Sequence, residues 1–194
     1  MPKERNILTN VKLKKLEIGI ETDQDMSEKQ AKIAFLSIGS NMGNKKKNIE
    51  LAKFKLEKNS IKIIKSSKNY ETLSWPNIKN PKFINIVLKI KTSISLKDLM
   101  KKCLYIEKEL GRSRNKKNEP RTCDIDIIDY DQKIVKSTKN QNLTIPHPKM
   151  HKRNFVLLPL YEIAKTWIHP IKKTSIKDLI NALDIENLRT IKII

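Results

Sequence analysis

The sequence predicts an α+β fold: a ferredoxin-like β-α-β-β-α-β core in which helices pack against a mainly antiparallel sheet. Strand-like runs and amphipathic helical patterns follow one another in this order from residue 33. The length of 194 residues and the hydrophobic share of 38% suffice for a sizeable core. Residues 1–31 do not share this pattern. We therefore expect an N-terminal extension of unknown role, followed by one domain over residues 32–194.

The first half of the core is expected between residues 33 and 92. The apolar run at 33–39 ends in Gly-Ser-Asn, which predicts a buried strand and a turn. Apolar residues at helical spacing predict a helix over 48–58. Residues 61–72 and 83–92 are strand-like, and the alternating isoleucines and leucine of the second predict one buried face.

The second half begins with a helix. Ser95 and Asp98 resemble a capping box, apolar residues follow at helical spacing, and Gly111 occupies the place of a C′ glycine. A basic loop at 112–120 then leads into the apolar stretch RTCDIDII at 121–128, which predicts a buried strand.

The remaining elements are predicted from prolines and caps. Residues 143–148 should be extended, because a residue that precedes proline avoids the helical region. A helix is expected over 152–164 with a bend at Pro159, and a last helix should run from Ser175 to about residue 183.

The charge alone does not predict a nucleic-acid partner. The chain has 41 Lys and Arg against 21 Asp and Glu, a net charge of +20, but only six of the basic residues are arginines. The lysines are spread over the whole chain, as the composition bias of an AT-rich genome would give. Four arginines fall between Arg112 and Arg153, and guanidinium suits an anionic small ligand as well as a polynucleotide. We therefore expect no nucleic acid as partner.

Location follows from what the sequence lacks. No apolar run approaches the roughly 20 residues of a membrane helix, so we expect no membrane partner. Cys103 and Cys123 have no metal or redox spacing, which favours a reduced, cytoplasmic protein.

The paired acids of RTCDIDII are the first candidate site. Residues i and i+2 of a strand share a face, so Asp124 and Asp126 should project together. Two such carboxylates could hold the two metal ions of a phosphoryl-transfer site, or they could be the solvated acidic face of an edge strand. Arg112, Arg114 and Arg121 nearby could form plain salt bridges with these acids, but they are also what a site needs to hold both Mg²⁺ and a polyphosphate. No P-loop sequence is present.

Histidines and aromatic residues leave alternatives open. His147 lies between two prolines and could be a functional residue or a turn histidine without a role. His151 and His169 are interpreted as surface residues. Phe83 and Phe155 are expected in the core from residue type alone.

Five blocks in order resemble one enzyme family. They are IGSN (38–41), YETLSW with PKFINIV (70–75 and 81–87), IEKELGRSR (106–114), PRTCDIDII (120–128) and IPHPKMHKRNFVLLPLYEIA (145–164). Together they are similar to the 6-hydroxymethyl-7,8-dihydropterin pyrophosphokinases of folate biosynthesis, over about residues 33–170. The resemblance implies a ferredoxin-like transferase that moves pyrophosphate from ATP to the pterin hydroxymethyl oxygen and releases AMP.

The resemblance also implies roles for single residues. Asp124 and Asp126 would hold two Mg²⁺ ions that bridge the ATP phosphates, and Arg112 and Arg121 would neutralise charge during transfer. The other matched positions are Glu107, His147 and Arg153 around the nucleotide, and Thr72, Phe83, Asn85 and Phe155 in the pterin pocket. There Asn85 would hydrogen-bond the pterin edge, and the two Phe rings would sandwich its plane.

The sequence leaves alternatives open for the function and for the N-terminal extension. The main alternative is an RNA-binding ferredoxin-like module, and a second is a metal-dependent nucleotidyltransferase with a similar strand. Residues 7–20 weakly resemble the first strand of dihydroneopterin aldolase. The extension could be a fusion remnant, an added strand on the sheet or an arm that binds a partner, and other folate-pathway enzymes are candidate partners.

Overall fold

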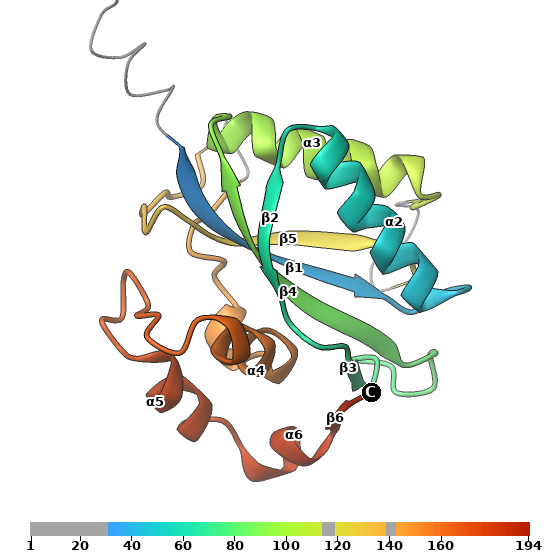
Figure 1. Cartoon of the computed structure of the whole chain (residues 1–194). Helices are drawn as coiled ribbons and strands as arrows, with labels where there is room; N and C mark the ends of the chain where they lie inside the picture. The colour runs from blue at the N-terminus through green and yellow to red at the C-terminus, as the bar shows by residue number, and fades with distance from the viewer. Residues whose placement is uncertain (1–30, 114–118, 139–142) are drawn as a thin grey trace, which may run out of the picture. The chain divides into compact units, whose positions relative to one another are not determined.

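Among the residues that the structure describes, a six-stranded sheet forms the centre of the fold (Figure 1). The computed structural model describes residues 31–113, 119–138 and 143–194. The strands are β1 (Lys32–Ser40), β2 (Lys62–Ser66), β3 (Tyr70–Thr72), β4 (Phe83–Thr92), β5 (Asp124–Tyr130) and β6 (Ile191–Ile193). Their order is β5-β1-β4-β3-β6, and β2 also pairs with β4. All five strand pairings are antiparallel, which confirms the predicted class.

Helices cover both faces of this sheet (Figure 1). The helical elements of the described chain are α2 (Lys45–Lys58), α3 (Leu96–Glu109), the short 3₁₀ turn η1 (Met150–Lys152), α4 (Asn154–Ile163), α5 (Ile176–Asn181) and α6 (Ile185–Arg189). Buried residues of α2 and α3 pack with one face of the strands, and those of α4 and α5 pack with the other. The sheet therefore separates two hydrophobic clusters.

The strand sequences explain this division. In β4, Ile84 and Ile86 face the α2–α3 cluster, whereas Val87 faces α4. In β5, Ile125 and Ile127 also face α2 and α3, and the alternation leaves Asp124 and Asp126, two of the three acids of this strand, on the α4 side. The alternation predicted from the sequence is confirmed in both strands.

Predicted caps are present at α3. The Ser95 side chain accepts a hydrogen bond from the backbone N–H of Asp98, and its hydroxyl donates to the Asp98 carboxylate at 2.7 Å. At the other end, Gly111 has φ of 83°, a left-handed conformation that suits glycine. The sequence therefore located both ends of this helix.

Several element boundaries differ from the prediction. The single strand expected over 61–72 is two strands, since the Ser67 hydroxyl accepts the Val87 N–H and replaces the regular ladder between them. The helix expected over 152–164 is interrupted at Arg153, which is extended. The last predicted helix ends at Asn181, and neither α6 nor β6 was expected.

His169 is the clearest error of the sequence reading. It was interpreted as a surface residue, but only 4% of it is exposed. Its Nδ1 accepts hydrogen bonds from the backbone N–H groups of Ile171 and Lys172, and its ring lies edge-on to Trp167. The turn that follows is thus built around this imidazole.

None of the helices in the described ranges combines the length and apolar character that a bilayer crossing needs. The strand considered for residues 7–20 lies outside the described residues, as do residues 114–118 of the basic loop.

We expect acidification to destabilise the protein through His169. Burial lowers its pKa, and the nearby His151 and Lys172 lower it further. The unfolded imidazole, with a pKa of about 6.5, then binds protons that the folded one does not. The free energy of unfolding should therefore fall as pH drops below that unfolded value toward the folded pKa.

Denaturant unfolding at pH 7 and pH 5 measures this loss. His169→Asn keeps an acceptor oxygen near the Nδ1 position and should show a smaller loss than the parent. His151→Asn, at a partly exposed position, is the matched control and should reduce the loss less. An unchanged pH dependence in His169→Asn would contradict the assignment.

Candidate active site

Two carboxylates of β5 form the centre of the site. Asp124 and Asp126 lie on the face opposite to the buried Ile125 and Ile127. Their side chains are 21% and 36% exposed, so both remain accessible to a ligand. The expectation that the two acids project together is confirmed by this burial pattern.

Strand register brings further predicted residues to the same face. Gly39 of β1 lies between Asp124 on β5 and Asn85 on β4. The Asn85 side chain donates a 2.9 Å hydrogen bond to Thr72 Oγ1, and both residues are buried. This leaves the Asn85 carbonyl oxygen directed toward Gly39, where an added Cβ would lie 2.9 Å from it.

Arg112 is positioned by the end of α3. The N–H of Gly111 bonds to the Lys108 carbonyl, and the N–H of Arg112 bonds to the Glu107 carbonyl, the pattern of a Schellman motif. This turn directs Arg112 back toward the helix. Its Nη1 bonds to Glu107 Oε1 at 2.5 Å and also to Asp124 Oδ1.

Glu107 lies behind the carboxylates. It is 2% exposed, and its Oε1 accepts a 2.7 Å hydrogen bond from the backbone N–H of Ile125 in addition to the Arg112 contact. One buried acid thus joins α3, Arg112 and the backbone of β5. Its predicted place around a nucleotide remains a prediction.

Asp126 pairs with a different arginine. Arg153, at the extended residue before α4, bonds to Asp126 Oδ2 at 3.0 Å. His147 Nε2 lies 3.9 Å from the same oxygen and 3.5 Å from Arg153 Nη1. Burial lowers the pKa of His147, and the charge of Arg153 lowers it further although Asp126 opposes this. We therefore treat the imidazole as neutral near pH 7.

A guanidinium group lies over the ring of each of the two predicted aromatic residues. Arg121 lies 5.1 Å from the centroid of Phe83 and bonds to Asp124 Oδ2 at 2.8 Å. Arg153 lies 5.5 Å from the centroid of Phe155 and bonds to Asp126. Both rings are only half-buried, which differs from the core position that residue type alone suggested. In each case one arginine thus links an aromatic ring to a carboxylate.

The charges of this cluster balance without a ligand. Three acids are opposed by three arginines, and the described residues contain no group of three or more His, Cys, Asp and Glu side chains that could enclose a metal ion. Mg²⁺ commonly takes only one or two carboxylates and completes its shell with water and substrate phosphates. The pair on β5 fits that requirement. Arg121 Nε is buried without a hydrogen-bond partner in the described chain, as suits a site awaiting an anion.

Asn41 is a site residue that the sequence reading did not single out. It is 2% exposed, and its Nδ2 donates to Ser74 Oγ and the Pro81 carbonyl, both at 3.2 Å. Its Oδ1 accepts the Arg121 N–H at 2.7 Å. One amide thus connects the loop before β4 to the loop before β5. The sequence feature that could have indicated this residue is an asparagine directly after a predicted buried strand.

Comparison with known proteins finds one family. The sequence model described as 7,8-dihydro-6-hydroxymethylpterin-pyrophosphokinase (HPPK) matches residues 35–165. The 2-amino-4-hydroxy-6-hydroxymethyldihydropteridine pyrophosphokinase of Aquifex aeolicus is 38% identical over 144 residues, which cover 74% of this chain and 88% of the relative.

Longer relatives also match. Folic acid synthesis protein FOL1 of Dictyostelium discoideum is 41% identical over 138 residues, 71% of this chain but 20% of that protein. The chain spans a similar share, 19%, of fol1 from Pneumocystis carinii. Among solved structures, wild-type HPPK-DHPS of Plasmodium falciparum matches with a TM-score of 0.61 and 18% identity, over 78% of this chain and 41% of that one. This last likeness supports the fold alone.

Gly39→Ala should distort the site. The new Cβ would lie 2.9 Å from Asn85 Oδ1 and 3.4 Å from Phe83 Cδ1, so one of these side chains must shift. We expect a loss of about 1–3 kcal/mol in the free energy of unfolding, as for overpacking elsewhere. Denaturant titration measures it, with Ser37→Ala on the same face of β1 as control. A fully stable Gly39→Ala would show that the space is not needed.

Asn41→Ala should loosen both loops. It removes two donated hydrogen bonds and leaves the partly buried Arg121 N–H without its acceptor, which costs about 1–3 kcal/mol. Faster amide hydrogen exchange at Arg121 and in residues 73–82 is the expected readout. Asn77→Ala, in the exposed part of the same loop, is the control and should leave Arg121 exchange unchanged. Equal exchange in the two variants would contradict the coupling.

Proposed function

The chain belongs to the 7,8-dihydro-6-hydroxymethylpterin-pyrophosphokinase family, and from this premise we propose that it transfers pyrophosphate from ATP to 6-hydroxymethyl-7,8-dihydropterin in folate biosynthesis. The chain is thus an ATP-dependent diphosphotransferase. The observation that carries the proposal is the pair of accessible carboxylates on β5, joined by arginines to two aromatic rings.

Asp124 and Asp126 would hold two Mg²⁺ ions. Arg112 and Arg121 pair with Asp124, and Arg153 pairs with Asp126, so phosphates that share these guanidinium groups would leave the carboxylates in need of further cations nearby. Bound Mg²⁺ would supply charge neutralisation for the triphosphate. The partial exposure of both carboxylates supports this assignment.

Arginines provide the protein's own neutralising charge. The pterin hydroxyl oxygen bonds to the β-phosphorus of ATP and releases its proton. The bond between that phosphorus and the oxygen that bridges it to the α-phosphorus breaks, and AMP leaves with this oxygen. Negative charge moves onto the leaving phosphate, where fixed guanidinium groups lower its energy. Arg112 and Arg121 lie beside Asp124, and Glu107 holds Arg112 in place.

The pterin would bind beside Asn85. We assign its edge contacts to Asn85 and Thr72, which are already hydrogen-bonded to each other, and its faces to Phe83 and Phe155. A flat polar heterocycle binds well between aromatic faces. Each ring is also contacted by a guanidinium group, so a pterin between the rings would lie close to phosphates bound by those groups. Arg153 and His147 would lie on the nucleotide side.

An RNA-binding module receives no support from these relatives, which are named for folate enzymes. RNA-recognition sheets present aromatic residues on their strands and have no use for paired acids, whereas here the corresponding face carries Asp124 and Asp126.

The remaining assignments are also proposals. Residues 32–194 would form the catalytic domain and residues 1–31 a separate extension. Buried free Cys103 and Cys123 suit a reducing, cytoplasmic setting. Other enzymes of folate synthesis are candidate partners for the extension.

Asp126→Asn tests the catalytic assignment. The protein is incubated with ATP, Mg²⁺ and 6-hydroxymethyl-7,8-dihydropterin, and AMP is measured. We expect AMP formation to fall on the order of 100-fold or more, because a neutral amide cannot replace the carboxylate charge. The melting temperature should stay close to that of the parent, since the side chain is partly exposed.

Asp131→Asn is the matched control, on an exposed residue directly after β5 with a left-handed conformation that asparagine also accepts. It should retain full activity. Normal AMP release by Asp126→Asn would remove Asp126 from the mechanism, and release of ADP by the parent would replace the proposed reaction with ordinary kinase chemistry.

A further inference from the structure

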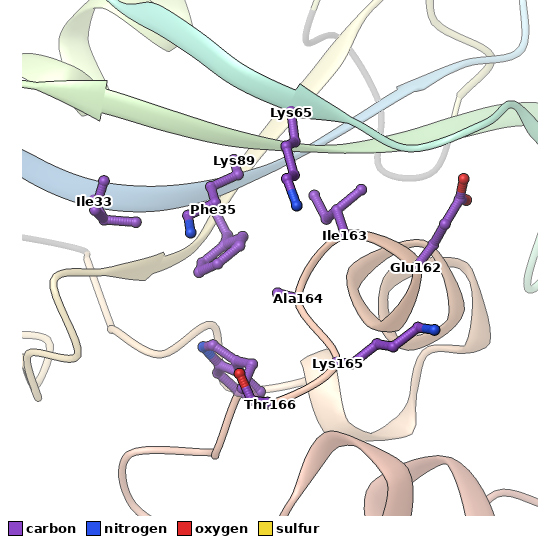
Figure 2. Close-up of a pocket in the computed structure, with 10 residues that line it drawn as sticks. Ile33, Phe35, Lys65, Lys89, Glu162, Ile163, Ala164, Lys165 and Thr166 are labelled. Atoms are coloured by element: carbon purple, nitrogen blue, oxygen red, sulfur yellow. The ribbon is translucent and has the colours of Figure 1, made fainter.

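A cavity lies on the α4 side of the sheet, away from the cluster of Asp124 and Asp126. It has a volume of about 520 Å³, within the size range of small-molecule sites. Its walls come from β1, β2 and β4 on one side and from residues 162–167 at the end of α4 on the other (Figure 2). Lys89 is four residues beyond Asn85 on the same face of β4, about 13 Å along the strand.

Two lysines face each other at this cavity. Lys65 of β2 and Lys89 of β4 are direct cross-strand partners, and Lys89 is also opposite Phe35 of β1. All three therefore share one face, and Figure 2 shows them directed from the strands toward residues 164–166. Like charges placed directly opposite on neighbouring strands repel each other. The two repelling lysines both line the cavity.

No carboxylate compensates these two charges. Within the described ranges, neither Lys65 nor Lys89 forms an ion pair. Glu162 also lines the cavity, but its carboxylate accepts hydrogen bonds from the Tyr70 hydroxyl at 2.9 Å and from the Lys68 N–H at 3.1 Å. Burial and this carboxylate raise the pKa of Tyr70, so the phenol remains a donor. These neutral donors leave the charge of Glu162 in place but direct its carboxylate toward Tyr70 and Lys68.

The other walls are apolar and aromatic. Phe35, Ile163 and Trp167 line the cavity and are each less than a tenth exposed. Trp167 is held in place, since its Nε1 donates a 2.8 Å hydrogen bond to the buried carboxylate of Asp129. A ligand here would meet fixed rings beside two uncompensated ammonium groups.

We propose that this cavity binds a small aromatic anion, with its ring against Phe35 and Trp167 and its carboxylate or phosphate between Lys65 and Lys89. The anion would relieve the lysine repulsion, and the ring would cover apolar surface. The site is separate from the catalytic carboxylates, and the proposal does not rest on the proposed function.

Trp167 provides a local probe. The chain has two tryptophans, so Trp75→Phe leaves Trp167 as the single indole. In this background, phenyl phosphate and benzoate are titrated while Trp167 fluorescence is followed. We expect a saturable change with at least one of them, and the comparison identifies the preferred head group. Inorganic phosphate and benzyl alcohol, which each carry half of the proposed chemistry, should bind at least tenfold more weakly.

A matched pair of double variants tests the lysines. Lys65→Gln with Lys89→Gln should weaken binding at least tenfold. Lys62→Gln with Lys91→Gln removes the same charge from another cross-strand lysine pair of β2 and β4 that does not line the cavity, and it should change affinity less than twofold. The exposed Lys65→Gln alone serves if the first double variant does not fold.

The outcomes are decisive. Specific loss in the cavity variant supports the site. Absence of a saturable signal, equal binding of benzyl alcohol, or equal loss in both double variants would overturn it, because the last result would mean that only the overall charge of the protein attracts the anion.

Discussion

The pairing of two β5 carboxylates with guanidinium groups from separate segments is the interaction on which the site depends. Asp124 is held by Arg112 and Arg121, and Asp126 by Arg153. These arginines come from the end of α3, the loop before β5 and the residue before α4. Each carboxylate therefore connects distant parts of the chain. Replacing Asp124 would remove the acid that Arg112 and Arg121 share, whereas replacing Asp126 would leave Arg153 without its ion-pair partner.

Much of the fold could be predicted because it follows from local patterns. The isoleucine alternation of β4, the capped ends of α3 and the shared face of Asp124 and Asp126 all repeat over a few residues. The six-strand order could not be read this way, since β6 pairs with β3 through residues far apart in sequence. The break between β2 and β3 depends on one serine hydroxyl that replaces a ladder contact.

The site was predictable in its residue types and only partly in its geometry. Ordered sequence blocks indicated the acids, the arginines and the residues that we propose for the pterin. They did not indicate that Arg121 and Arg153 lie over the two Phe rings, or that Asn41 joins two loops. His169 was misread for the same reason: its burial comes from packing against Trp167 and from backbone N–H groups that a single sequence does not reveal.

The Schellman turn after α3 has an evolutionary consequence. Gly111 reverses the backbone before the basic loop begins, and Arg112 is fixed by bonds to its own helix. Insertions or deletions downstream of Arg112 can therefore accumulate between species without moving that guanidinium. A change in the loop would therefore leave the direction of the Arg112 side chain unaffected, whereas a change at Gly111 would alter both the loop and that side chain.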